Sequence, residues 1–330
     1  MPSLDPRRDG DSLADYEAPL FLAWQLTNRC MARCLACCEE SGPERAWPDE
    51  LSAAQALQLA RGIVASDIPY VAFGGGEPLG VPHCWTLFQE LTAGGVAIKL
   101  ETDGSHIDEH AAARLAELAV PCVQISVDGA CAMTHERCRP GSSYAAALGA
   151  IERLVARARP PQWVFAPNRL NLHELLPAYD LAARLGCDAF VTGPLMRLGR
   201  AAADWQRLAC DPADWEERIT ALREHAQASG YPLRLAVYPW DILEELRQRL
   251  AHPQAMLLVV PNGRVKLLNA LPFSVADLRH DSLDDAWRAY RAGWQRAEVR
   301  AFVLACRERP ELLRHANAIW PLEGAPALAG

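Results

Sequence analysis

Residues 20–37 read Leu-Phe-Leu-Ala-Trp-Gln-Leu-Thr-Asn-Arg-Cys-Met-Ala-Arg-Cys-Leu-Ala-Cys, an apolar run followed at once by three cysteines. Cys30, Cys34 and Cys37 form a Cys-x3-Cys-x2-Cys triplet at the end of the strand that we predict for 20–27. Closed iron–sulfur clusters and structural zinc sites take four protein ligands, so a set of three leaves one metal position open. The spacing therefore predicts a metal centre that can bind and act on a small molecule.

Two less specific explanations of the triplet remain open. Cysteine is often buried, and the chain contains 11 of them, so a triplet can arise from core packing alone. A zinc site with Cys38 as the fourth ligand is the other explanation, although ligands at adjacent positions fit a tetrahedral site poorly.

A glycine-rich motif follows at residues 73–78, which read Phe-Gly-Gly-Gly-Glu-Pro after the apolar segment 70–73. Glycines at the end of a strand let the backbone approach a ligand, because no Cβ is in the way. Together, the cysteine triplet and the Gly-Gly-Glu strand resemble the signature of the radical S-adenosylmethionine (SAM) enzymes. The two motifs occur in the order that this family requires.

The resemblance implies a cofactor for each motif. Cys30, Cys34 and Cys37 would hold one [4Fe–4S] cluster, whose open iron binds the amino and carboxylate groups of SAM. The strand with Gly75, Gly76 and Glu77 would cradle the amino group. In this family an electron from the cluster splits SAM, and the resulting radical takes a hydrogen atom from the substrate. An electron donor such as flavodoxin or ferredoxin is therefore an expected partner.

Short apolar segments alternate with helical patterns along the first two thirds of the chain, which predicts a parallel sheet covered by helices. Six strand–helix units match a partial (β/α)6 TIM-type barrel, the α/β fold that the resemblance implies, rather than a closed eight-unit barrel. We expect a polar N-terminal tail at 1–18, the barrel at 19–205 and a small α+β extension at 206–330. The candidate strands are 20–27, 68–74, 97–102, 121–128, 162–167 and 188–193.

Further SAM contacts are expected at the carboxyl ends of these strands. Ser126 and Asp128 resemble the family residues near the SAM ribose, and Arg139 resembles the arginine that neutralises the SAM carboxylate. A solvated loop charge is the alternative for Arg139. Ala36 stands where the family usually has an aromatic residue, so we expect its backbone to meet the adenine with weaker stacking.

Glu101 is a further candidate for cofactor binding, because it shares a face of its strand with Lys99 and should point into the barrel. A salt bridge between the two side chains inside the barrel is the alternative explanation.

The extension resembles the SPASM or twitch region of radical SAM enzymes. Two apolar arms around Pro261-Asn262-Gly263 predict a hairpin within 256–268, and two helices are expected at 283–303 and 309–318. SPASM regions bind additional clusters through cysteines, but here Leu268 occupies one such position and no cysteine lies between Cys210 and Cys306. We therefore expect a remnant without a cluster, with Leu267 or Leu268 filling the space.

Composition limits the remaining choices. The chain has 330 residues, a net charge of -8 and no basic run, so we expect no nucleic-acid partner. No apolar stretch reaches the roughly 18 residues of a membrane span, and the first residues lack an apolar signal core. We expect a cytoplasmic protein with no membrane partner, where a reducing environment keeps the thiols available to metal.

The leading functional hypothesis is a radical SAM enzyme in peptide modification or in quinone or tetrapyrrole cofactor biosynthesis. The chain resembles the branch with the pyrroloquinoline-quinone, heme-d1 and alternative-heme synthesis proteins. Its substrate would be a peptide, a small molecule or a tetrapyrrole. The rival hypothesis is a catalytically silent scaffold of the same fold that presents a peptide or tetrapyrrole to a partner.

Overall fold

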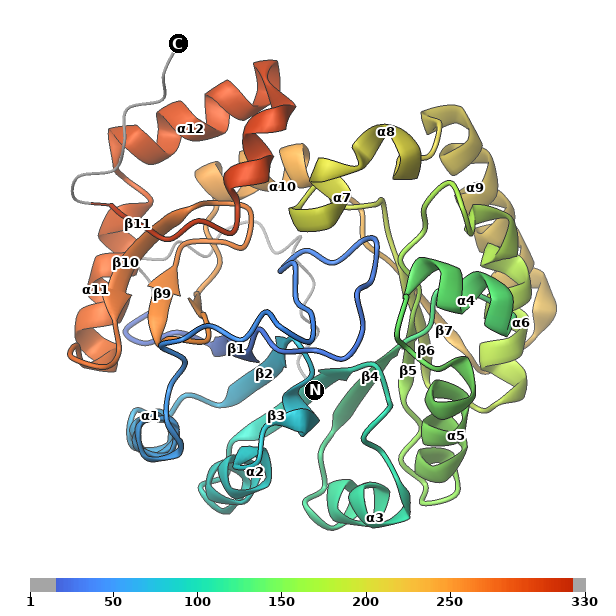
Figure 1. Cartoon of the computed structure of the whole chain (residues 1–330), viewed down its shortest axis with the longest axis horizontal. Coiled ribbons are helices and arrows are strands. Elements are labelled where there is room, and N and C mark those ends of the chain that lie inside the picture. Colours follow the sequence, from blue (N-terminus) through green and yellow to red (C-terminus); the bar gives the residue numbers. More distant parts are fainter. Residues whose placement is uncertain (1–15, 323–330) are drawn as a thin grey trace.

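The structure is a computed structural model that describes residues 16–322, so most of the tail expected at 1–18 lies outside the described residues. Within 16–322 the strands form one eleven-stranded sheet in the order β11-β10-β9-β8-β1-β2-β3-β4-β5-β6-β7. The sheet curves around the middle of the molecule, and helices lie outside it (Figure 1). None of the described helices is both long and apolar enough to cross a membrane.

The six predicted strands form the central part of this sheet, and each neighbouring pair is parallel. The partial-barrel prediction is therefore confirmed. Buried residues alternate along the strands, with Leu22, Trp24 and Leu26 facing the helices. The strands are β1 (Phe21–Thr27), β2 (Tyr70–Gly75), β3 (Ala97–Thr102), β4 (Cys122–Ser126), β5 (Gln162–Val164) and β6 (Ala189–Thr192).

Local signals explain where the covering helices begin. Ser52 and Gln55 form the predicted capping box at the first helix, and Asp108 accepts a hydrogen bond from the Ala111 amide at the third. Gly186 has φ +82° just after a further helix, as a left-handed cap requires. These elements are α1 (Ala53–Ala65), α2 (Cys84–Ala93), α3 (Glu109–Glu117), α4 (Ala132–Cys138), α5 (Tyr144–Val155) and α6 (Leu175–Arg184), with short 3-10 turns at η2 (Pro78–Gly80) and η3 (Leu172–Glu174).

Strands of the region after residue 205 extend the sheet at both edges, which the sequence did not predict. β7 (Arg234–Val237) pairs in parallel with β6. β8 (Met256–Val259) forms the predicted hairpin with β9 (Arg264–Lys266) but also pairs in parallel with β1. β10 (Phe273–Asp277) and β11 (Trp320–Pro321) complete the sheet. The division at residue 205 stays a prediction, because one sheet crosses it.

The helices of this second region surround the added strands. The predicted helix at 283–303 is two helices, because the chain turns at 294–296, after Gly293 packs closely against Leu267 and Val275. The predicted helix at 309–318 is a 3-10 turn. The elements are α7 (Gly199–Ala203), α8 (Trp205–Leu208), α9 (Pro212–Ser229), α10 (Ile242–Ala251), α11 (Leu283–Gly293), α12 (Ala297–Glu308) and η4 (Pro310–His315).

Candidate functional site

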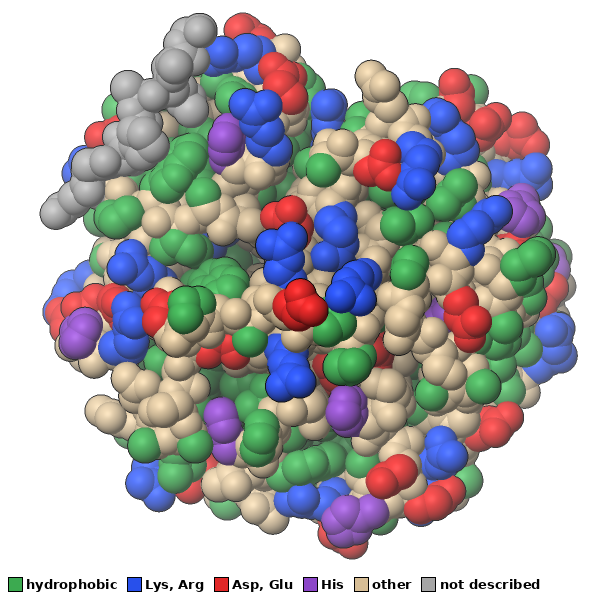
Figure 2. Space-filling model, in the orientation of Figure 1, with side chains coloured by type: hydrophobic (Ala, Val, Ile, Leu, Met, Phe, Trp, Pro, Cys, Tyr) green, Lys and Arg blue, Asp and Glu red, His purple; other side chains and the backbone are tan. Residues whose placement is uncertain are grey.

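The cysteine triplet lies on the loop that leaves β1 and crosses the centre of the molecule (Figure 1). Cys30, Cys34 and Cys37 all line one cavity of about 210 Å³. Backbone hydrogen bonds hold the loop, including one from the Leu35 amide to the Cys138 carbonyl at 2.9 Å. Basic side chains gather over the middle of this face, at the position of the loop (Figure 2). The three thiols therefore line one cavity, and their role as cluster ligands stays a prediction.

The state of the three thiols follows from their burial. Burial raises the pKa of Cys30 to about 12 and also raises the pKa values of Cys34 and Cys37. The thiols are therefore protonated before metal binds, and metal binding would release their protons. Within residues 16–322 no three His, Cys, Asp or Glu side chains are close enough to hold a single metal ion. A cubane needs no such convergence, because its cysteine ligands are spread over different irons.

The glycine motif forms the end of β2, beside the cysteine loop. Gly75 has φ +106°, and a Cβ on Gly76 would lie only 2.0 Å from the Arg29 carbonyl oxygen. The Gly76 amide donates to the Thr27 carbonyl at 2.7 Å. Gly75 and Gly76 both line the cavity. Gly76 is thus required for packing against the start of the cysteine loop, a reason that the sequence did not supply.

Glu77 lies behind the cavity wall, where it organises the backbone. Its carboxylate is 3% exposed and accepts hydrogen bonds from the Thr102 hydroxyl and from the amides of Leu79 and Asp103, at 2.9–3.1 Å. Burial raises the pKa of Glu77 to about 8. The carboxyl group therefore joins the end of β2 to the end of β3, and a direct contact between Glu77 and SAM stays a prediction.

Ser126, Asp128 and Arg139 line the same cavity as the cysteines. Arg139 Nε donates to Asp128 Oδ2 at 2.6 Å, and its Nη1 lies 3.6 Å from Cys34 Sγ. The other Asp128 oxygen accepts from the Ala166 amide at 2.8 Å. Arg139 is thus a fixed cation next to the thiols rather than a solvated loop charge, which suits an anionic group in the cavity.

His135 supports this pair from behind. It is fully buried, and its Nδ1 accepts from the Asp128 amide at 3.1 Å, so its Nε2 carries the proton toward Ser142 at 3.0 Å. Burial, together with the Arg139 charge, lowers the pKa of His135 to about 4. His135 is therefore neutral at pH 7.

Glu101 and Ala36 also line the cavity. Glu101 Oε1 accepts from Lys99 Nζ at 2.6 Å, so the ion pair considered above is formed. Glu101 Oε2 lies 3.2 Å from the position that a Cβ on Gly74 would take, and Glu101 borders a second cavity as well. A contact of Ala36 or Glu101 with SAM stays a prediction.

Arg200 is the main site residue that sequence reasoning missed. Its Nε donates to the Cys34 carbonyl and its Nη1 to the Ser41 carbonyl, both at 2.7 Å. A Cβ on the preceding Gly199, at φ +49°, would lie 2.4 Å from the Cys37 carbonyl. Arg200 Nη2 is buried without a hydrogen-bond partner among the described residues. The sequence signal was the Gly199-Arg200 pair at the point where the alternation of strands and helices stops.

Known proteins share both the sequence and the fold of this chain in part. Residues 24–167 match the model of the radical SAM superfamily. This part of the chain is therefore a radical SAM domain. The chain is 35% identical over 193 residues to the mycofactocin maturase MftC of Mycobacterium ulcerans, covering 58% of this chain and 52% of the relative. It is 27% identical to an AdoMet-dependent heme synthase of Methanosarcina barkeri, covering 69% and 64%. The chain spans about half the length of the first curated relatives that it matches.

Solved structures share the fold of this chain. The SAM-bound SuiB of Streptococcus suis superposes with a TM-score of 0.67 at 12% identity, covering 81% of this chain and 65% of SuiB. AdoMet-bound anSMEcpe gives a TM-score of 0.60 at 14% identity, covering 82% and 80%. At such identities the likeness shows the fold alone.

The residues present fit the cofactors that the superfamily binds, a [4Fe–4S] cluster and SAM. Four cysteines of the loop line the cavity, and three of them, Cys30, Cys34 and Cys37, have the spacing that suits a cubane with one open iron, whereas Cys38 directly follows Cys37. The two cations Arg139 and Arg200 flank the thiols, which suits an anionic cluster and the carboxylate of SAM. The glycine backbone beside them leaves room for the ligand.

Proposed function

We propose that this protein is a radical SAM enzyme that abstracts a hydrogen atom from its substrate, in peptide modification or in the biosynthesis of a quinone or tetrapyrrole cofactor. The observation that carries the proposal is the common cavity of Cys30, Cys34, Cys37 and the glycine end of β2. This cavity adjoins a second one, with which it shares Glu39, Gly74, Gly75 and Glu101.

The protein's own residues would bind and orient the reactants. Cys30, Cys34 and Cys37 would hold the cluster, which supplies the electron that converts SAM into a hydrogen-abstracting radical. Asp128 fixes Arg139 at 2.6 Å, so the guanidinium is already in place for a carboxylate. Arg200 joins the cysteine loop to α7 and keeps the loop over the strand ends.

The names of the relatives support two classes of substrate. A maturase and two solved structures with bound peptides, SuiB with the precursor peptide SuiA and anSMEcpe with Cp18Cys peptide, favour a peptide. Heme synthases among the relatives favour a tetrapyrrole. The extension lacks the cysteines for a further cluster, so we favour redox-neutral outcomes such as epimerisation, which need no second electron acceptor. We place the enzyme in the cytoplasm, with flavodoxin or ferredoxin as electron donor.

Reconstitution tests this proposal against the silent scaffold. The protein is loaded anaerobically with iron and sulfide and then reduced with dithionite in the presence of SAM. An enzyme produces 5′-deoxyadenosine and methionine, and the Cys34→Ala variant does not. If the loaded wild type binds SAM and leaves it intact, the protein is a scaffold.

A further inference from the structure

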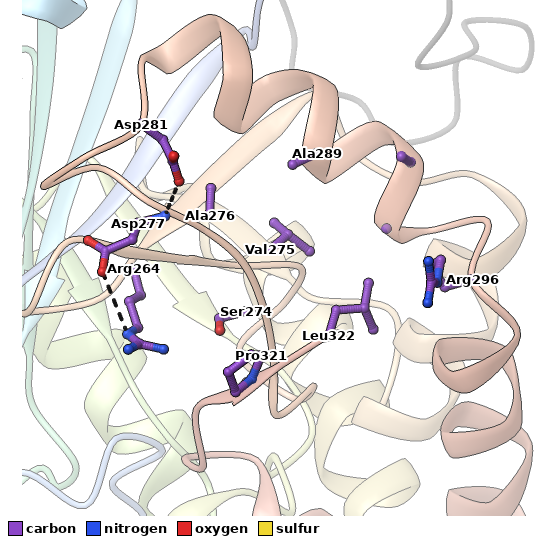
Figure 3. Close-up of a pocket in the computed structure, with 12 residues that line it drawn as sticks. Arg264, Ser274, Val275, Ala276, Asp277, Asp281, Ala289, Arg296, Pro321 and Leu322 are labelled. Atoms are coloured by element: carbon purple, nitrogen blue, oxygen red, sulfur yellow. Dashed lines mark hydrogen bonds and ion pairs between the residues drawn. The ribbon is translucent and has the colours of Figure 1, made fainter. Parts of the chain in front are cut away.

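The cavities of the described chain differ in whether their charged side chains are already paired. Under α11, a cavity of about 390 Å³ contains Asp277, which pairs with Arg264 at 3.9 Å, and Asp281, which accepts from the Asp277 amide (Figure 3). These charges need no ligand. A second cavity, of about 280 Å³, adjoins the cysteine cavity, and two of its lining residues have a buried polar atom without a partner among the described residues: the donor Trp24 Nε1 and the acceptor Glu245 Oε2.

This second cavity lies between β1, β2, β8 and α10, so both regions of the chain build it. Because it shares Glu39, Gly74, Gly75 and Glu101 with the cysteine cavity, a molecule bound here lies beside the SAM site. Most of its wall is hydrophobic and comes from scattered segments. The apolar lining residues include Met196, Ile242, Met256, Leu258 and Leu268.

Glu245 on α10 gives the cavity its chemical character. The residue is only 5% exposed, and its Oε1 accepts from Arg249 Nε at 2.6 Å. Its Oε2 is buried and has no hydrogen-bond partner in residues 16–322. Leaving a buried charged acceptor unsatisfied is costly, so a donor supplied by a ligand would be favourable there.

The wall offers no cation. Glu101 is acidic, and no lysine or arginine lines the cavity. Lys99 and Arg249 pair with Glu101 and Glu245 through one oxygen each and do not belong to the wall. A carboxylate entering the cavity would meet like charges, whereas an ammonium group would meet acceptors.

We propose that this cavity binds the reacting part of the substrate, and that Glu245 recognises a cationic hydrogen-bond donor, an amine, carried on an apolar body. The inference rests on the proposed function, because it takes the neighbouring cavity as the SAM site. The apolar wall would bind the hydrocarbon part, and Glu245 Oε2 would accept from the ammonium group. Substrates that present a carboxylate to this wall are thereby disfavoured.

Two probes with the same hydrocarbon body test the inference. Binding of 3-phenylpropylamine and of 4-phenylbutyrate to the SAM-bound, cluster-loaded protein is measured by ligand-observed NMR. One hydrogen bond to a charged acceptor predicts that the amine binds about tenfold more tightly than the carboxylate. Glu245→Gln places an amide donor at the free oxygen and should remove this preference. Glu244→Gln, on the exposed side of the same helix, should keep it.

A second variant covers the case in which Glu245→Gln does not fold. Leu268→Trp fills the cavity from the segment after β9 and should weaken both probes. Equal or tighter binding of the carboxylate, no binding of either probe, or an unchanged preference in Glu245→Gln overturns the inference. Formation of 5′-deoxyadenosine by the same wild-type preparation is measured separately. Its absence contradicts the proposed function, whereas its presence without an amine preference contradicts only this inference.

Discussion

The two halves of the molecule differ in how the sequence specifies their parts of the site. In the first half, the proposed cluster ligands lie within 30–37, and the glycines proposed to face SAM lie at the end of the next strand. In the second half, no short motif marks the cavity wall, whose residues Ile242, Met256 and Leu268 come from separate elements. Metal binding requires a fixed local spacing of thiols, whereas an apolar wall can be assembled from any segments that pack together.

Of the changes that test this comparison, loss of one proposed cluster cysteine should have the largest effect on iron content and activity. Cys34→Ala removes one of three ligands, so we expect reconstituted iron to fall to near zero and SAM cleavage to stop. Iron analysis and absorption spectra measure the change. Cys122→Ala, on β4 outside the cavity, is the control and should keep its iron. Full iron content in Cys34→Ala would show that the local motif is not the metal site.

Gly76→Ala should be nearly as severe, because the added Cβ would lie 2.0 Å from the Arg29 carbonyl and must displace the start of the cysteine loop. We expect both iron content and SAM affinity to fall, rather than SAM affinity alone. The control is Gly95→Ala, where φ is +81° but nothing lies within 4 Å of the new Cβ. That control costs about 1–2 kcal/mol of backbone strain and should keep its iron. Unchanged SAM binding in Gly76→Ala would contradict the described packing.

Arg200→Gln tests the contact by which α7 reaches the cysteine loop. Two charged hydrogen bonds to the Cys34 and Ser41 carbonyls are lost, so we expect the free energy of unfolding to fall by about 2–4 kcal/mol. Denaturant unfolding of the protein measures this change. Arg207→Gln removes an exposed pair with Asp204 and should cost at most about 1 kcal/mol. Equal losses in the two variants would mean that Arg200 does not hold the loop.

In the first half, we expect buried His135 to cause a smaller effect, a pH dependence of the free energy of unfolding. Its pKa rises from about 4 in the fold to its ordinary 6.5 on unfolding, so the unfolded state binds more protons between these values. Stability contributed by neutral His135 is complete above pH 6.5 and declines as the pH falls toward 4, by about 3 kcal/mol in total. His135→Asn keeps an acceptor for the Asp128 amide and should flatten this part of the stability profile.

The matched control is His106→Asn, which replaces an exposed histidine and shows whether a change in the profile is specific to buried His135. Denaturant unfolding between pH 4 and 8 measures all three proteins. If the His135→Asn variant shows the same pH profile of stability as the wild type, His135 is not the source of the pH dependence.

The sequence predicted what local spacing determines and missed what tertiary pairing determines. The cysteine loop, the capping box at Ser52 and the hairpin turn at Gly263 each depend on a few neighbouring residues, and all are found. The parallel pairing of β8 with β1 depends on residues more than two hundred positions apart, and no pattern indicated it. Arg200 and Glu245 were missed for the same reason, since each acts through contacts formed only in the folded chain.

The most specific prediction for the second half is that it binds no second cluster. In the second half, Leu267 and Leu268 are buried in the core, as expected for a region that packs hydrophobically instead of binding metal. Cys306 is fully buried on α12, and Cys210 is the other cysteine after residue 205. Two cysteines fall short of the about four ligands that a closed cluster needs.

Iron and sulfide content after anaerobic reconstitution therefore tests the central claim most directly. We predict about four irons and four sulfides per chain for the wild type, the content of one cubane. The triple variant Cys30→Ala, Cys34→Ala and Cys37→Ala should retain essentially none. About eight irons in the wild type, or a cluster that persists in the triple variant, would contradict a single metal centre in the first half.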